Sequence, residues 1–446
     1  MLITKSRIAY ALALWVGVGI VYGAPGLSAP RWIEEGPGPI LNADSFIPPN
    51  NPVSGAINAI AANQTNPDLV YAGTVNGGIW KTTNPTADSP SWSPLTDRRL
   101  PGLSINSLAV SPLHPHILFA GTGSTSSYNF DGSPGFGVAR SADGGRTWTV
   151  LAQDTFSGRR INSIVPTALD DGNVVLAATL IDSPPGESTT ANLVIPAGGV
   201  FRSDDMGDSF VRLSGNGSSG LPDQGVSSLV ADPGNRKRFY AAVPAFLSNA
   251  TGSEGVYRSD DGGVTWAAVN TGLTDLDSSL RILLAIHNNH FHRTNVVYAA
   301  ILGKARPGLL GVFRSDDLGA TWTALGVPPY DIYTSGQQFT HGALAADPTD
   351  PNVVFIRGDF NPAARGDASL LPQSPWIGLF GEETNRTSPH ADSRRMAFDA
   401  NGDLLEADDG VFIDLLIRTT VSVNATGRQS MATFALRNST RSRTIR

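Results

Sequence analysis

The stretch VYRSDDGGVTW at residues 256–266 decides the fold, because the chain repeats its pattern. The pattern is S-x-D-x-G-x-T-W, and its copies begin at Ser141, Ser203, Ser259 and Ser315. The copy at Ser203 ends in Ser209 and Phe210 in place of Thr and Trp. A long interval shared by several copies is typical of an array of similar supersecondary units.

Each residue type in the pattern has a structural role. A short apolar run comes before the pattern and a large aromatic residue begins the next run, which predicts a strand, a tight turn and a second strand. The aspartate can accept backbone N–H bonds within the turn, and the glycine can adopt positive φ. We therefore interpret four aspartates as structural turn residues: Asp143, Asp205, Asp261 and Asp317.

A second repeated phrase predicts the number of units. It consists of an apolar strand, a turn that is often Asp-Pro or Asn-Pro, and another apolar strand. Seven copies occur, at residues 57–74, 105–122, 161–179, 226–243, 282–301, 343–357 and 396–407. Each copy fits the two inner strands of one propeller blade.

On these motifs the chain resembles the Asp-box, or BNR-repeat, β-propeller superfamily over about residues 31–412. That superfamily includes sialidases, xyloglucanase-type glycoside hydrolases and sortilin-type receptor domains. The resemblance implies an all-β fold: a single seven-bladed β-propeller of four-stranded antiparallel blades, with Asp boxes in the outer hairpins. We expect residues 32–34 to supply the missing outer strand of the last blade, which would close the ring without an exposed edge.

The amino-acid composition excludes several kinds of partner and site. The 446 residues carry a net charge of −7, so nucleic acid is not an expected partner. Cysteine is absent, which excludes disulfides and thiolate sites. Residues 1–23 are typical of a secretory signal peptide, so we expect a secreted or periplasmic protein with no membrane span once the signal is removed, and a monomer. Residues 413–446 form either a basic tail or an altered reading frame.

Successive strands of an antiparallel blade turn at alternate faces of the propeller. The Asp boxes join third and fourth strands, so the loops between second and third strands lie on the opposite face. The connectors from one blade to the next lie on that opposite face as well. Several of these segments combine aromatic, amide and charged residues, which suit a sugar ring and its hydroxyls. The alternative is a polar connector with half-buried aromatics. The ligand-binding candidates are Tyr128, Arg159, Arg160, Tyr330, Tyr333, Gln337, His341, His390 and Arg394.

We expect a propeller that binds a glycan or an extracellular protein without catalysis. The alternative is a glycoside hydrolase of sialidase-like or xyloglucanase-like type, with Asp331 and Asp392 as its carboxylate pair. Val75 stands at the position matching a catalytic Asp of xyloglucanase-type enzymes, which counts against that activity. A sialidase would need an arginine cluster, for which the candidates are Arg159, Arg160, Arg281 and Arg394.

No cofactor and no metal site are expected. Two groups of residues could bind a cation, but each has a simpler interpretation. We interpret His287, His290 and His292 as part of a surface turn rather than a zinc site. The acidic residues near the end of an inner strand, Glu406, Asp408 and Asp409, are interpreted as solvated turn acids rather than cation ligands.

Overall fold

The structure is a computed structural model. It describes residues 55–85, 87, 90–124, 133–180, 198–245, 252–289, 292–305, 308–360, 363–379 and 389–409, together with the backbone of four short strands outside those ranges. Tyr128, His290, the expected signal peptide at 1–23 and residues 416–446 lie outside the described residues. Almost all regular structure in the described part is β-strand. The exceptions are α1 (Gln153–Phe156) and three turns of 3₁₀ helix at Asp170–Gly172, Leu276–Ser278 and Ala368–Leu370.

Six four-stranded sheets are each built from consecutive strands, all antiparallel. The first three contain β4 (Ile57–Ala62), β5 (Val70–Thr74), β6 (Ile79–Thr82) and β7 (Trp92–Pro94); β8 (Ile105–Val110), β9 (Leu118–Thr122), β10 (Val138–Ser141) and β11 (Thr149–Leu151); and β12 (Ile161–Pro166), β13 (Val175–Thr179), β14 (Gly199–Ser203) and β15 (Val211–Arg212).

The next three continue in the same order. They contain β16 (Ser228–Ala231), β17 (Phe239–Val243), β18 (Gly255–Ser259) and β19 (Ala267–Ala268); β20 (Ser279–Asn289), β21 (Thr294–Gly303), β22 (Leu309–Ser315) and β23 (Thr323–Gly326); and β24 (Ala343–Ala346), β25 (Val353–Arg357), β26 (Ala363–Asp367) and β27 (Trp376–Leu379).

The last four-stranded sheet takes strands from both ends of the chain. Its order is β1 (Trp32–Glu34), β30 (Phe412–Leu415), β29 (Leu404–Ala407) and β28 (Arg395–Phe398). Residue 32 pairs with residue 415 and residue 34 with residue 413, which confirms that the N-terminal strand completes this sheet. β30 runs three residues past the expected end of the propeller at residue 412. A separate pair joins β2 (Ile40–Leu41) to β3 (Pro52–Val53).

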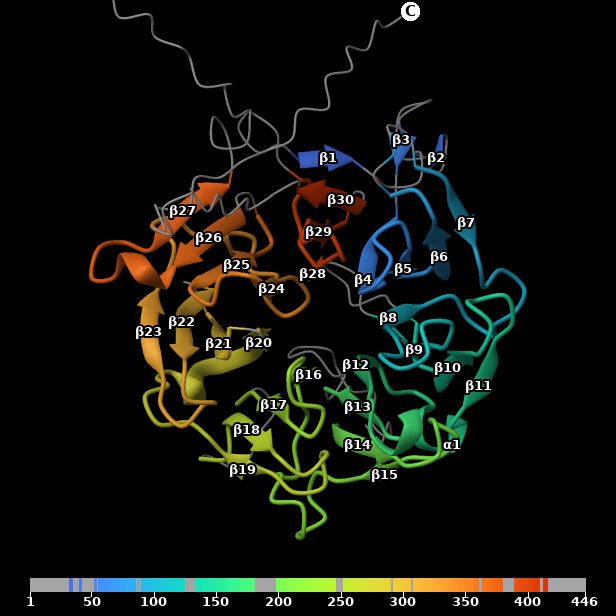
Figure 1. The fold of residues 1–446 in the computed structure, drawn as a ribbon, viewed down its shortest axis with the longest axis horizontal. Helices are drawn as coiled ribbons and strands as arrows, with labels where there is room; N and C mark the ends of the chain where they lie inside the picture. The colour runs from blue at the N-terminus through green and yellow to red at the C-terminus, as the bar shows by residue number, and fades with distance from the viewer. Residues whose placement is uncertain are drawn as a thin grey trace, which may run out of the picture.

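The sheets stand around a common centre, as Figure 1 shows. Each inner strand contacts the inner strand of the next sheet, and β28 contacts β4, so the ring is closed. The predicted all-β propeller of four-stranded antiparallel blades is thus confirmed. Six blades consist of consecutive strands, and the expected count of seven is reached only by counting the composite sheet as a blade.

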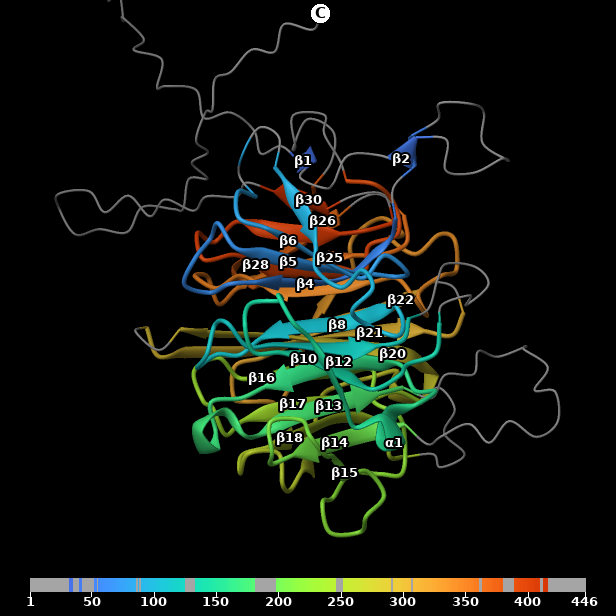
Figure 2. The ribbon, with the colours of Figure 1, turned by 90° about the vertical axis from the view of Figure 1, so that its right-hand side faces the viewer.

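The strands run roughly along the ring axis, so the connections gather on two opposite faces (Figure 2). The four S-x-D-x-G segments join third to fourth strands, and we call their side the box face. The opposite face, which we call the connector face, carries the passages from one blade to the next. Loops held by a rigid scaffold are common places for binding sites.

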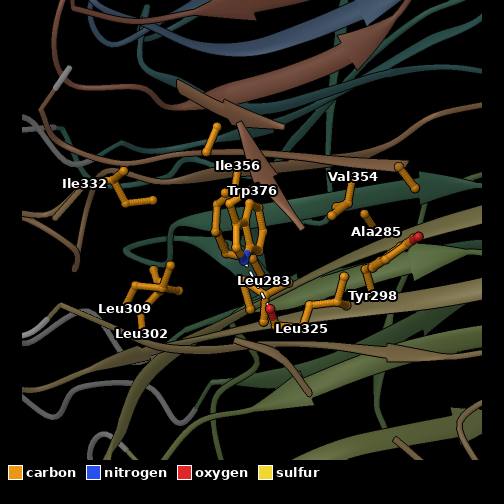
Figure 3. Close-up of a cluster of buried hydrophobic side chains, with 14 of the residues drawn as sticks. Leu283, Ala285, Tyr298, Leu302, Leu309, Leu325, Ile332, Val354, Ile356 and Trp376 are labelled. Atoms are coloured by element: carbon orange, nitrogen blue, oxygen red, sulfur yellow. Dashed lines mark hydrogen bonds between the residues drawn. The ribbon is translucent and has the colours of Figure 1, made fainter. Parts of the chain in front are cut away.

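Apolar side chains between neighbouring sheets hold the blades together. In the cluster between the β20–β23 and β24–β27 sheets, Trp376 packs among Leu302, Leu325 and Ile356 (Figure 3). Its indole Nε1 donates to the Leu325 carbonyl oxygen at 3.1 Å, so the buried ring has no unsatisfied donor. Tryptophan therefore joins adjacent blades through both packing and a hydrogen bond.

One repeat of the turn shows how the pattern works. Ser259 Oγ donates to Asp261 and accepts from the Gly263 amide at 2.9 Å. Asp261 in turn accepts from the amide and hydroxyl of Thr265. Gly263 has φ +85°, which an L-residue rarely adopts. In the other three copies Asp143, Asp205 and Asp317 likewise accept a hydrogen bond from the hydroxyl four residues later.

One expectation about histidine is wrong. His287 was interpreted as part of a surface turn, but it lies within the long strand β20 and is 1% exposed. Its Nδ1 is 2.6 Å from the Asp347 carbonyl oxygen and its Nε2 is 2.8 Å from the Thr294 hydroxyl. The long β20–β21 hairpin carries this ring into the interface with the next blade, where its polar atoms are satisfied.

Candidate functional site

The connector between β23 and β24 supplies the first residues of the candidate site. Asp359, at the end of the neighbouring second strand, accepts hydrogen bonds from the backbone amides of Ser335 and Gln337, the latter at 2.6 Å. The His341 amide donates to the Gln337 carbonyl oxygen at 2.9 Å, which coils the connector just before β24. The connector thereby presents the side chains of Gln337 and His341 toward the last sheet.

His341 lies at the centre of a polar cluster. Its side chain is 0% exposed, and its Nδ1 is 2.9 Å from Asp392 Oδ1, whose side chain is 17% exposed. Gln337 Nε2 donates to the same Asp392 oxygen at 3.5 Å. Asp392 itself has φ +68°, a left-handed conformation that aspartate tolerates better than most residues. The carboxylate is therefore held from two sides at the surface of the connector face.

A second carboxylate faces the other nitrogen of the same ring. Asp409 Oδ2 is 4.0 Å from His341 Nε2, and Asp409 also pairs with Arg394 Nε. Arg394 NH1 donates to Asn58 Oδ1 at 2.7 Å, which links the last inner strand to the first. The imidazole therefore stands between two partly exposed carboxylates, and an arginine compensates one of them. We call Gln337, His341, Asp392, Arg394 and Asp409 the histidine cluster.

A buried ion network lies beneath this cluster. Arg357 NH1 is 2.8 Å from Glu406 Oε1 and 3.7 Å from Asp408 Oδ2, and all three side chains are 0% exposed. Burial raises the pKa of Glu406, although Arg357 acts in the opposite direction. The interpretation of Glu406 and Asp408 as solvated turn acids is therefore wrong. They neutralise an arginine whose NH2 also donates to the Pro389 carbonyl oxygen at 3.2 Å.

Of the residues expected in the site, four come together: Gln337, His341, Asp392 and Arg394 belong to the histidine cluster. Sequence reasoning missed Asp409 as a member, because its position depends on pairing across the ring. The only signal was its place in an acidic run at the end of an inner strand.

The other expected residues of the β23–β24 connector have separate environments. Asp331 is exposed and accepts from the Tyr333 amide at 2.8 Å within its own loop. Tyr333 is 0% exposed and belongs to the apolar core, so its ring is not presented to a ligand. Tyr330 is half-buried, and its hydroxyl donates to the Ala363 carbonyl oxygen at 3.3 Å. His390 is exposed beside the cluster, with Nδ1 3.1 Å from the Ala391 carbonyl oxygen.

Arg159 and Arg160 lie in the connector that leads into β12, on another blade. The Arg159 guanidinium stands over the Phe201 ring, 5.2 Å from its centroid. This stacking gives Arg159 a packing role. Among the arginines that a sialidase would need, Arg281 and Arg394 line a common cavity at the centre of the ring, which does not include Arg159 or Arg160.

The histidine cluster also has the atoms of a cation site. Ligand atoms of His341, Asp392 and Asp409 lie within 4.8 Å of one another. Arg394, however, already pairs with Asp409, and its positive charge opposes a cation at that oxygen. The donor set is therefore better suited to hydrogen bonds with a neutral or mixed-polarity ligand than to a divalent ion.

No protein-family model matches the chain. Among curated proteins it is similar to a xyloglucanase from a Paenibacillus species, with 24% identity over 329 residues. That match covers 68% of this chain and 29% of the xyloglucanase. The chain therefore spans about a third of the length of the relatives it matches.

Solved structures show the same fold at low identity. The GH74 xyloglucanase from Xanthomonas campestris is 19% identical with a TM-score of 0.53, over 86% of this chain and 53% of that one. YCF48 from Cyanidioschyzon merolae is 14% identical with a TM-score of 0.51, over 86% of this chain and 98% of that one. Both comparisons establish the propeller fold. No helix in the described part of the chain has the length and apolarity needed to cross a bilayer.

Proposed function

We propose that this chain is a secreted seven-bladed Asp-box propeller that binds a polysaccharide at the histidine cluster without hydrolysing it. The observation that carries the proposal is the pairing of both partly exposed carboxylates: Asp392 with His341 at 2.9 Å, and Asp409 with Arg394. Glycoside hydrolysis requires one carboxylic acid that keeps its proton for the leaving group. Here each carboxylate is already engaged by a partner within the cluster, so neither carboxyl group stands free to face a leaving group.

The resemblance to xyloglucanases supports a carbohydrate ligand but not their activity. The matching position of their catalytic Asp is Val75, whose side chain is 6% exposed and whose amide donates to the Ala56 carbonyl oxygen at 2.9 Å. Position 75 therefore supplies neither an acid nor a base. The partly exposed amide of Gln337 and the carboxylates of Asp392 and Asp409 remain on the connector face to bond sugar hydroxyls, while the buried His341 imidazole positions the two carboxylates.

A second candidate is a retaining glycoside hydrolase that uses Asp392 and Asp409. Their carboxylate oxygens lie within 4.8 Å of one another. This approach is close to the separation of about 5–5.5 Å between the two carboxyl groups of retaining enzymes. The two candidates differ in whether a bond is broken, which a product assay measures directly.

The test uses the full chain on a panel of plant and bacterial polysaccharides that includes xyloglucan. Affinity electrophoresis measures binding, and reducing-end release measures hydrolysis. We expect retention on one polymer with no release, and binding about tenfold weaker in Asp392→Asn, in line with the loss of a hydrogen bond to a charged group. The matched control is Asp204→Asn, because Asp204 is 64% exposed on the box face and pairs with Arg202.

Two outcomes would contradict the proposal. Release of reducing ends by the unmodified chain, abolished in Asp392→Asn while binding remains, would establish the hydrolase. Equal loss of binding in Asp392→Asn and Asp204→Asn would place the ligand away from the histidine cluster.

A further inference from the structure

The centre of the ring holds a cavity of about 280 Å³. Residues of the inner strands β4, β8, β12, β20 and β28, among others, line it. Figure 1 shows these strands around the centre of the ring. Asn58, Asn106 and Asn162 occupy the second position of the first three inner strands, toward the connector face. Two of these amides fasten neighbouring blades, since Asn58 donates to the Ile105 carbonyl oxygen at 3.2 Å and Asn162 to that of Val226 at 3.0 Å.

The charge of this cavity differs from that of the whole molecule. Its described lining includes Arg281, Arg394 and Arg395 and no aspartate or glutamate, although the chain as a whole has a net charge of −7. Low-dielectric walls that carry one sign of charge focus the field within a cleft and raise the local concentration of the opposite ion. The positive charge of the lining therefore favours an anionic ligand over a neutral one.

The three arginines are compensated to different degrees. Arg394 pairs with Asp409, so its charge is neutralised. Arg281 NH1 donates to the backbone carbonyl oxygens of Gln338 at 3.3 Å and His341 at 3.1 Å, which satisfies hydrogen bonds but supplies no counter-charge. Arg395 is exposed, and its side chain makes no hydrogen bond or ion pair with any residue that the structure describes.

The arginines also influence one another. The pKa of Arg281 is lowered to about 10, mainly by burial and also by the charges of Arg395 and Arg394, while Tyr333 acts in the opposite direction. The guanidinium remains protonated at neutral pH. Two positive charges therefore face the cavity without an anion from the described residues, a condition that a bound anion would relieve.

We propose that the cavity binds the carboxylate of an acidic sugar residue through Arg395 and Arg281, so that the ligand is a uronate-containing polysaccharide. This inference rests on the proposed function. A guanidinium offers a planar fork of donors that matches both oxygens of a carboxylate. The cavity volume of about 280 Å³ lies near the lower end for small-molecule sites, about 300–1,000 Å³, which suits one sugar ring rather than a chain.

The cavity adjoins the histidine cluster, so one polysaccharide chain can occupy both, with its acidic sugar in the cavity. Arg394 belongs to both, because it lines the cavity and pairs with Asp409. The carbonyl oxygens that Arg281 contacts belong to Gln338 and His341 in the connector of the cluster. A polymer on the connector face can thus place a carboxylate in the cavity and the hydroxyls of a neighbouring sugar against Asp392.

The experiment compares two forms of one polymer. Polygalacturonate and its carboxyl-reduced form, which is neutral, are tested with the full chain by affinity electrophoresis. We expect polygalacturonate to bind at least about tenfold more tightly, and Arg395→Gln to remove that preference, since hydrogen bonds to charged groups are stronger than those between neutral groups. Arg395→Lys should restore part of it, because it keeps the charge but not the bidentate fork.

The matched control is Arg236→Gln, which removes the same charge from an exposed turn on the box face. Equal binding of the two polymers, or an unchanged preference in folded Arg395→Gln, would overturn the anion site. If only the neutral polymer binds, the proposed function stands and the anion site fails. If no polymer binds, the proposed function fails, and calorimetry with galacturonate and with inorganic phosphate tests the anion site alone.

The two small anions distinguish the sources of the charge. Binding of galacturonate that Arg395→Gln abolishes supports a sugar carboxylate. Tighter binding of phosphate than of galacturonate contradicts the uronate assignment, and no binding of either anion contradicts the site.

Discussion

Asp143 accepts hydrogen bonds on both carboxylate oxygens within its turn. Oδ1 accepts from the Ser141 hydroxyl and the Thr147 amide, each at 2.9 Å, and Oδ2 accepts from the Thr147 hydroxyl at 2.6 Å. The hydroxyl bond from Thr147 is the largest cause that lowers the pKa of Asp143, which falls to about 2. Hydrogen bonds to a carboxylate favour its charged form.

Thr147→Val tests this cause at the scale of one residue. We expect the pKa of Asp143 to rise toward the ordinary aspartate value of about 3.9, because the valine cannot donate. Since the folded-state pKa is depressed, the stabilisation is present above the unfolded pKa and is lost as the pH falls toward about 2. A carboxyl titration followed by NMR measures the shift.

Thr321→Val provides the control, because Thr321 makes the same contacts to Asp317 in another blade. It should leave the Asp143 titration unchanged. An Asp143 midpoint that stays near 2 in Thr147→Val would assign the depressed pKa to the backbone amides instead.

Tryptophans that precede or lie within outer strands join one blade to the next. Trp376 begins β27, is 7% exposed, and bonds to Leu325 of the preceding blade at 3.1 Å. We expect Trp376→Ala to lower the free energy of unfolding by about 3–5 kcal/mol, because it leaves a cavity in the cluster between two blades. Denaturant unfolding measures the loss.

The neighbouring residue Ile377 is the control for that substitution. Its side chain lies on the other side of β27 and is 40% exposed. Ile377→Ala should change the free energy of unfolding by at most about 0.5 kcal/mol, as surface substitutions commonly do. Equal effects of the two substitutions would show that the outer strand, and not the contact between blades, limits stability.

Strands and turns were predictable at this scale because their signals are local. Ser259, Asp261 and Thr265 lie within a stretch of seven residues, so their spacing alone predicts their contacts. Burial depends on partners distant in the chain and was not predictable in the same way. Tyr333 is the kind of aromatic residue that stacks on sugars, but its ring packs in the core. Glu406 stands in an acidic run that is typical of a turn, but its carboxylate is buried against Arg357.

The whole ring determines the candidate site, because the site lies where the ring closes. The bond between Arg394 and Asn58 joins residues 336 positions apart, from the last and first inner strands. Arg357 and Glu406 likewise meet only because β25 and β29 belong to adjacent blades. Sequence reasoning identified four members of the histidine cluster from their connectors, whereas Asp409 and the arginine cavity required the closed ring.

Closure therefore has a consequence for both stability and binding. Removal of residues 1–36 deletes β1 and leaves β30 as an unpaired edge, whereas removal of residues 1–30 keeps β1. We expect the longer deletion to lower the free energy of unfolding by about 1–3 kcal/mol relative to the shorter one, from lost backbone hydrogen bonds. Thermal unfolding measures this loss, and size-exclusion chromatography detects the association that an exposed strand edge promotes.

The same pair of truncations tests whether closure supports the site. β29 lies between β30 and β28, and the chain leads directly from β29 to Asp409. A loosened β30 should therefore displace Asp409 from Arg394 and weaken polysaccharide binding in the longer deletion but not in the shorter one. Identical unfolding midpoints and identical binding in the two truncations would show that β28 and β29 hold the site without help from the N-terminal strand.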